Sequence, residues 1–197
     1  MNFLAHLHLS GTTEEVIVGN FIGDFVKGKK YKNYPDKVAK GIMLHRAIDE
    51  YTDSHEVVEQ SKNHLRKKYR HYSGVIVDMF YDHFLARNWA TFHHLSLSEF
   101  TIKSYAIIDE HYDMLPSQAQ YMYPFMKTNN WLLAYASTEG IQRALNGMSR
   151  RTTFRSKMEQ ATQELKQYHQ AFEQEFLSFY PDLMAFARSW RIENNLE

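Results

Sequence analysis

Apolar side chains recur every three or four residues along most of this chain, which is the spacing of amphipathic helices. No run alternates between apolar and polar residues for long enough to predict a strand. The pattern therefore predicts an all-α protein with helices over about residues 12–27, 35–53, 75–92, 96–115, 118–135, 141–148, 152–180 and 181–190, and with a basic segment at 62–71.

Capping signals set several of these boundaries. Thr12 and Glu15 have the spacing of a capping box, and Gly28 is a natural end for the helix that they begin. A serine, Ser96 or Ser98, is expected to cap the helix that starts there. These signals place the first turns of two helices from local chemistry alone.

Only four prolines and eight glycines interrupt the pattern. Pro124 predicts a kink or break inside its helix, and Pro181 predicts the start of the last helix. No repeat or low-complexity linker divides the chain, and 197 residues is within the usual size of one domain. We therefore expect one all-helical domain over residues 1–197.

The composition excludes several classes of protein. Apolar residues make up 44% and charged residues 23%, which indicates a folded protein and not a disordered one. The 23 basic and 23 acidic residues cancel, so a general nucleic-acid-binding protein is disfavoured. The absence of cysteine excludes a disulfide scaffold, a thiolate nucleophile and a cysteine-ligated metal.

Neither a secretory signal nor a membrane span is indicated. The opening MNFLAHLHLSG lacks a basic segment, and histidines interrupt its apolar run. No stretch approaches the roughly 18–20 apolar residues that cross a bilayer. We therefore expect a soluble cytoplasmic protein with no membrane partner.

Two carboxylates lie on a stripe that the pattern predicts to be buried. Asp78 and Asp82 are one helical turn apart in a segment that is apolar on all sides. Buried carboxylates are costly without a partner, so cations must face them or one must hold a proton. His83 lies about 100° further around the helix and reaches the same site only from its edge.

Two other predicted helices also bring polar chemistry to apolar faces. His45 and Asp49 are one turn apart on the second helix, with Asp53 at the margin of that face. Asp24 lies on an apolar face of the first helix. Imidazole and carboxylate ligands without sulfur suit Mn, Fe, Zn or Ni, and the mixture alone does not choose among them.

Each of these residues also has a structural interpretation. A single histidine on an apolar face is more often a hydrogen-bonded core residue than a ligand, and Asp49 or Asp53 can pair with Arg46 or with lysines. His6 and His8 share a side only if their segment is extended. A metal site is favoured for the set as a whole, because three helices each contribute a carboxylate.

Basic residues gather in three clusters although the net charge is zero. The clusters are Lys27, Lys29, Lys30 and Lys32; Arg66, Lys67, Lys68 and Arg70; and Arg150, Arg151, Arg155 and Lys157. Such polarity suits a phosphate-bearing ligand or an acidic protein partner, although at least one cluster is expected to be an ordinary solvated surface.

An ordered set of motifs extends over nearly the whole chain. The motifs are MNFLAHLHLS at 1–10, GNFIGDFVKG at 19–28, LHRAIDEYTD at 44–53, DMFYDHFLARNW at 78–89, RALNGMSRR at 143–151 and FYP at 179–181. In this order and spacing they resemble the bacterial acyl carrier protein phosphodiesterases.

This resemblance implies a fold, a reaction and a cofactor. The fold would be all-helical and distantly related to the HD metal-dependent phosphohydrolases. The reaction would hydrolyse the phosphodiester that joins 4′-phosphopantetheine to a serine of holo-acyl carrier protein. The cofactor would be a divalent metal, most readily Mn²⁺, with Fe, Mg, Zn and Ni not excluded. The usual His-Asp order of the HD class is reversed at Asp82-His83, so its ligand set cannot be copied.

The resemblance also implies roles for matching residues. The implied metal ligands are Asp24, His45, Asp78 and Asp82. The implied catalytic residues are Asp24, His83 and His6, and Asp49 and Asp53 would support the ligands. The implied docking residues for the acidic carrier are Lys27, Lys29 and Lys30 or Arg66, Lys67, Lys68 and Arg70. Trp131, Tyr135 and Phe125 either line a pantetheine channel or, more simply, pack in the core.

Two other functions stay open. A metal-dependent hydrolase of a small phosphoester or nucleotide would use the same pocket without a wide docking face. A non-enzymatic helical interaction protein would use the buried aspartates and histidines as a polar core network and would bind no metal.

Overall fold

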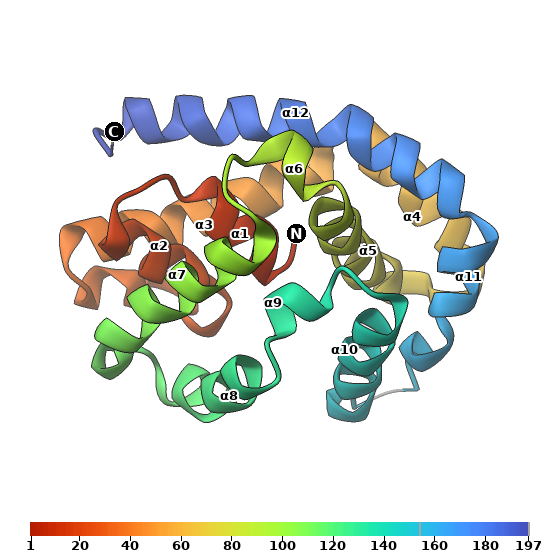
Figure 1. The fold of residues 1–197 in the computed structure, drawn as a ribbon, viewed down its shortest axis with the longest axis horizontal. Coiled ribbons are helices and arrows are strands. Elements are labelled where there is room, and N and C mark those ends of the chain that lie inside the picture. Colours follow the sequence, from red (N-terminus) through yellow and green to blue (C-terminus); the bar gives the residue numbers. More distant parts are fainter. Residues whose placement is uncertain (154, 197) are drawn as a thin grey trace.

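The computed structural model describes residues 1–153 and 155–196, and every regular element within them is a helix (Figure 1). The α-helices are α1 (Phe3–Leu9), α2 (Glu14–Phe21), α3 (Asp36–Ser54), α4 (Glu56–Tyr69), α5 (Ser73–Arg87), α6 (Trp89–Phe92), α7 (Leu97–Glu110), α8 (Ser117–Thr128), α9 (Trp131–Ala134), α10 (Thr138–Arg151), α11 (Thr162–Gln167) and α12 (His169–Glu193). Short 3-10 segments are η1 (Gly23–Phe25), η2 (Gly28–Asn33), η3 (Arg70–Tyr72), η4 (Tyr112–Met114) and η5 (Met158–Gln160). The all-α prediction is confirmed.

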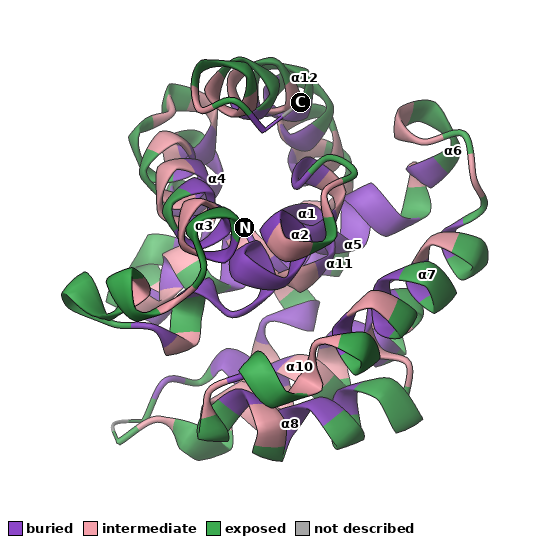
Figure 2. Cartoon of the chain, turned by 90° about the vertical axis from the view of Figure 1, so that its left-hand side faces the viewer, coloured by how far each residue is buried: buried purple, intermediate pink, exposed green. Residues whose placement is uncertain are grey.

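Helix α5 occupies the interior, where it contacts α1, α4, α10 and α12. Its sequence is apolar on all sides, and eleven of its fifteen residues are buried, as that pattern predicts. Helix α12 crosses one side of the molecule, while α8, α9 and α10 lie on the opposite side (Figure 1). Figure 2 shows the buried faces of the helices turned toward a shared interior.

The buried apolar side chains form one continuous core, to which both ends of the described chain contribute. Among the described helices, none is both long enough and apolar enough to cross a bilayer. The predicted domain over 1–197 and the predicted helix over 152–180 include Phe154 and Glu197, which lie outside the described residues.

The first predicted helix is shorter than expected and begins differently. Helix α2 ends at Phe21, and 3-10 turns follow it. In the first of these turns, Gly23 packs so closely on His45 that a Cβ would lie 2.2 Å from the imidazole ring. The N-cap is Thr13, whose side chain makes no capping hydrogen bond, so the predicted capping box is wrong there. The predicted serine cap is confirmed at Ser96, which forms a capping box with Glu99.

The C-terminal prediction needs a larger correction. Helix α10 continues to Arg151, and the long helix begins only at His169. It then continues through Pro181, which the sequence analysis placed at a helix start. A proline inside a helix removes one backbone hydrogen bond, and here buried Phe176, Tyr180 and Leu183 lie along the same helix on both sides of it. Core burial therefore outweighs the local breaking signal.

Two glycines allow α2 and α3 to approach each other closely. A Cβ at Gly19 would lie 2.1 Å from the carbonyl oxygen of Val38, and a Cβ at Gly41 would lie 2.4 Å from that of Val16. Both obstacles are backbone atoms, which cannot rotate away. This contact brings Asn20 beside His45, and so it positions the polar groups described below.

Replacing Gly41 with alanine is expected to lower the free energy of unfolding by about 3 kcal/mol, because the added methyl group overpacks the α2–α3 contact. Urea denaturation followed by circular dichroism measures this change. Gly147→Ala is the matched control, since a Cβ there meets only the end of Arg151 at 3.6 Å. The control should gain about 0.5–1 kcal/mol from helix propensity. Equal stabilities for the two variants would contradict the assigned role of the glycine contact.

Candidate metal centre

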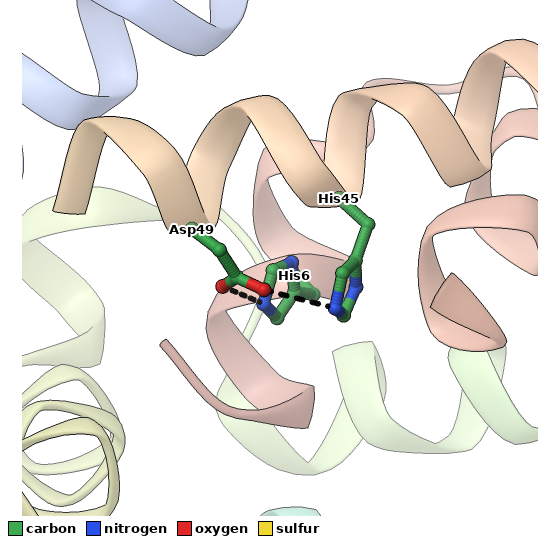
Figure 3. Close-up of side chains that lie close together, drawn as sticks. All are labelled: His6, His45 and Asp49. Atoms are coloured by element: carbon green, nitrogen blue, oxygen red, sulfur yellow. Dashed lines mark ion pairs between the residues drawn. The ribbon is translucent and has the colours of Figure 1, made fainter. Parts of the chain in front are cut away.

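Two histidines and an aspartate from distant parts of the chain converge on one point (Figure 3). His6 comes from α1, and His45 and Asp49 come from α3. The Nε2 atom of each histidine lies 3.2 Å from an oxygen of Asp49. The two imidazole rings stack at a centroid distance of 3.8 Å with 13° between their planes. Asp24 completes the cluster, with Oδ1 3.4 Å from His45 Nε2.

Asn20 holds both imidazole rings from behind. Its backbone oxygen lies 2.8 Å from Nδ1 of His45, and its side-chain oxygen lies 2.9 Å from Nδ1 of His6. The amide nitrogen of Asn20 donates to the His6 carbonyl oxygen and to Ser10, which identifies Oδ1 as the acceptor. Both histidines therefore carry a proton on Nδ1, and each turns Nε2 toward the carboxylates.

The arrangement of these atoms fits a bound cation. The Nε2 atoms of His6 and His45 are buried and make no hydrogen bond within the described part of the chain. Their lone pairs and the oxygens of Asp49 are mutually repulsive unless a proton or a metal ion lies between them. One ligand atom from each of the three residues lies within 4.8 Å of the others, which suits a shared ion.

The pKa values of His6, His45, Asp49 and Asp24 show how strongly these groups interact with one another. Burial and the neighbouring His45 lower the pKa of His6 to about 4, so His6 is neutral at pH 7. Burial also opposes the charge on His45, but Asp24 and Asp49 outweigh it and raise the pKa to about 9. Burial works against ionisation of Asp49, yet the two histidines hold its pKa far below the usual range. His45 likewise lowers the pKa of Asp24.

Asp78 faces a cation, as the sequence pattern requires of a buried carboxylate. The amino group of Met1 lies 2.9 Å from Asp78 and 3.6 Å from Asp49. Burial lowers the pKa of this amino group, but the two carboxylates outweigh that effect and raise it to about 10. Burial raises the pKa of Asp78, against the influence of the amino group.

A cavity of about 480 Å³ opens over this cluster. Asp24, Asp49, Asp53 and Asp78 give it an acidic floor. The other walls come from α8, α9 and α10 and include Trp131, Tyr135, Met148, Arg143 and Arg151. Phe125, which the sequence analysis grouped with the two aromatic residues, is exposed and lies outside the cavity lining.

Asp82 does not reach this cavity, although the sequence analysis expected a metal ligand there. It is fully buried, and it accepts hydrogen bonds from the backbone amides of Leu4 at 2.8 Å, Asn2 at 3.2 Å and Ala5 at 3.4 Å. Burial raises its pKa to about 7, against the Met1 amino group and these amides. Both carboxylate oxygens hold the first turn of α1, so Asp82 acts on the site by placing His6.

His83 and Asp53 also differ from their predicted roles. Nδ1 of His83 donates to the carbonyl oxygen of Tyr135 at 2.7 Å, so the ring supports the end of α9 and does not face the acidic floor. Burial lowers its pKa. Asp53 lies at the cavity edge but forms an ion pair with Lys62 at 2.7 Å, as the structural interpretation allowed.

The two basic runs predicted to dock the carrier differ in whether their side chains already form ion pairs. A second hollow of about 540 Å³ adjoins the cavity at Asp53, Val75 and Asp78, and Arg66 and Arg70 line it. Arg66 and Lys68 of this run are already paired, with Glu59 and Glu164. The other run, at Lys27, Lys29 and Lys30, follows Asp24 directly, and its lysines are exposed without an ion pair to any described residue.

Comparison with known proteins identifies the family of this chain. A family model described as acyl carrier protein phosphodiesterase matches residues 1–183. The chain belongs to the acyl carrier protein phosphodiesterase family. Proteins of that name from Yersinia pestis and Photorhabdus laumondii are 33% and 34% identical to it, covering 98% and 96% of this chain and 100% and 96% of theirs. No solved structure matches the chain significantly.

Asn20, inside the segment 19–28, is the residue of this cluster that the sequence analysis did not propose for the site. It lies on the predicted apolar face and is fully buried. A lone amide among apolar residues was the available signal, because a buried amide must find hydrogen-bond partners. Those partners are the two histidines, which the sequence could not pair with it.

Asn20→Ala is expected to weaken Mn²⁺ binding about 10- to 100-fold, because His6 loses the acceptor that fixes its proton on Nδ1. Isothermal titration of the metal-free protein with Mn²⁺ measures the affinity. Ser10→Ala is the control, since it removes a neighbouring hydrogen bond of Asn20 and leaves the contact between Asn20 Oδ1 and His6 intact. A loss of affinity of the same size in both variants would show that general loosening, and not the imidazole contact, is responsible.

Proposed function

We propose that this protein is a metal-dependent phosphodiesterase that removes 4′-phosphopantetheine from the serine of holo-acyl carrier protein and leaves apo-acyl carrier protein. The observation that carries the proposal is the pair of buried Nε2 atoms that face Asp49, a carboxylate on the floor of an open cavity. Membership of a family whose relatives bear the name of this activity supports the choice of substrate. A cytoplasmic location follows from the proposal, because the enzyme must share a compartment with its carrier.

The proposed metal ligands are His6, His45 and Asp49, with Asp24 beside them. Two imidazoles and carboxylates suit Mn²⁺, Fe, Zn and Ni better than Mg²⁺, which prefers oxygen ligands and water. A divalent metal, when bound, supplies positive charge that polarises the phosphodiester and acidifies a water molecule. The remaining requirements of the reaction fall to side chains of this chain.

Asp24 and His6 contribute in different ways. Asp24 stays ionised because His45 lowers its pKa, and its side chain is 65% exposed, so it can accept a proton from the attacking water. His6 is neutral at pH 7 because burial lowers its pKa, which favours a role as metal ligand over the implied role as catalytic residue. Asn20 keeps both imidazoles oriented throughout.

The proposed reaction is tested by the intact mass of purified holo-acyl carrier protein after incubation with the protein and Mn²⁺. We expect a mass loss equal to the 4′-phosphopantetheinyl group, abolished by a chelator and slowed about 100-fold or more by Asp49→Asn. Asp36→Asn, an exposed change on the same helix, is the matched control. An unchanged carrier mass with metal-loaded, folded protein would refute the substrate and direct attention to small phosphoesters.

We further propose that the carrier docks chiefly on Lys27, Lys29 and Lys30. Lysines without an ion pair attract an acidic surface without first losing a partner, whereas Arg66 and Lys68 would exchange one carboxylate for another. Long-range attraction of this kind raises the association rate and is screened by salt.

Lys29→Glu combined with Lys30→Glu is expected to lower kcat/KM for the carrier about tenfold or more at low salt, and less at high salt. Steady-state rates over a series of salt concentrations test this. Lys103→Glu combined with Lys166→Glu is the control, because it changes the net charge equally on exposed positions away from the cavity. A larger effect from Lys67→Glu combined with Arg70→Glu would assign docking to the other run.

A further inference from the structure

The wall of the cavity formed by α10 carries two arginines that have no role in the reaction as proposed above. Arg143, Gly147 and Arg151 follow one another at four-residue intervals, so they share one face of α10. All three line the same cavity as Asp24 and Asp49. The wall thus presents two guanidinium groups with no side chain between them.

These two arginines are not part of the ion-pair network of the described residues. Arg143 is exposed and makes no ion pair or hydrogen bond with a described residue. Arg151 uses Nε to donate to the backbone oxygen of Gly147 at 3.1 Å. Arg66 and Lys68, by contrast, each have a carboxylate partner. The guanidinium groups of the α10 wall therefore remain available to an anion that enters the cavity.

Gly147 indicates that the space between them is needed. A glycine inside a helix costs stability relative to alanine, and it is usually explained by close packing. Packing explains Gly140, where a Cβ would lie 1.9 Å from a backbone oxygen, but at Gly147 a Cβ would touch only Arg151, at 3.6 Å. The fold does not require this glycine, so its effect is to widen the cavity between the arginines.

We propose that Arg143 and Arg151 bind the phosphate group of the substrate, which fills the space over Gly147. This inference rests on the proposed function and names the residues that bind the phosphoryl oxygens on the side away from the metal centre. A phosphodiester entering a cavity with four carboxylates meets repulsion, and two guanidinium groups on another wall offset it. The fork of each guanidinium matches two phosphate oxygens, which a lysine does not.

Two kinds of anionic group could bind these arginines: the phosphate of the prosthetic group, or carboxylates on the surface of the carrier. The cavity favours the phosphate, because both arginines line the same hollow as Asp24 and Asp49. Carboxylates of a folded carrier would instead meet the exposed lysines at 27, 29 and 30. Free 4′-phosphopantetheine, pantetheine without phosphate, and apo-acyl carrier protein separate these sources experimentally.

The test measures the binding of 4′-phosphopantetheine to Mn²⁺-loaded protein by calorimetry. Arg143→Gln is expected to raise the Kd at least tenfold, because a charge-assisted hydrogen bond is lost. Pantetheine binding and apo-carrier binding should stay within about twofold of wild type. Arg150→Gln is the matched control, since Arg150 is an exposed neighbour on α10 outside the cavity lining, and it should leave all three affinities unchanged.

Gly147→Ala supplies a readout that a structural role would not produce. It should raise the unfolding temperature through helix propensity and yet weaken 4′-phosphopantetheine binding, because its methyl group enters the space between the arginines. A more stable protein with weaker binding supports the proposal. A more stable protein with unchanged binding overturns it.

The phosphate site and the proposed reaction can fail independently of each other. If wild-type protein releases 4′-phosphopantetheine from the carrier and Arg143→Gln binds this ligand as well as Arg150→Gln does, the phosphate site is wrong and the reaction stands. If Arg143→Gln weakens apo-carrier binding and not 4′-phosphopantetheine binding, the wall contacts carrier carboxylates and the proposal fails. If wild-type protein binds 4′-phosphopantetheine through Arg143 but leaves holo-carrier intact, the reaction fails and the phosphate site stands.

Discussion

The contact between one buried amide and two imidazole rings determines the chemistry of this protein. Asn20 accepts a hydrogen bond from His6 through its side chain and from His45 through its backbone, so both rings have the same tautomer and the same orientation. Without that constraint the rings would be free to turn Nδ1 toward Asp49, and the ligand geometry would vary. The metal centre therefore depends on the tight α2–α3 contact at Gly19 and Gly41, which carries Asn20 to His45.

Asp82 shows how a buried charge can act on a site without entering it. A carboxylate inside the protein must be satisfied, and the amides at the start of α1 satisfy this one. The N-terminus of a helix attracts negative charge, so the interaction also fixes the position and direction of a helix of only seven residues. Because His6 lies on that short helix, the carboxylate buried in α5 determines where one proposed metal ligand lies.

In the proposed function, the metal and the anionic substrate bind to different parts of the site. Carboxylates are concentrated on the floor of the cavity, where they favour a cation, while arginines lie on the α10 wall and lysines on the exposed segment after Asp24. A chain of zero net charge can thus present positive and negative groups within one site. Salt screens interactions between exposed charges more than about 10 Å apart, so the charges near the site dominate its potential.

The sequence by itself determined the all-helical class, the family and the pairing of His45 with Asp49, because helical periodicity relates residues within one helix. It could not place His6 in the cluster, since His6 and His45 lie 39 residues apart in the chain, on helices whose contact depends on packing. Nor could it distinguish Asp78, which reaches the cavity, from Asp82, which holds α1, because both lie on the same buried stripe. Tertiary packing decided these points, and it also carried α12 through Pro181, because burial of aromatic side chains outweighs one lost backbone hydrogen bond.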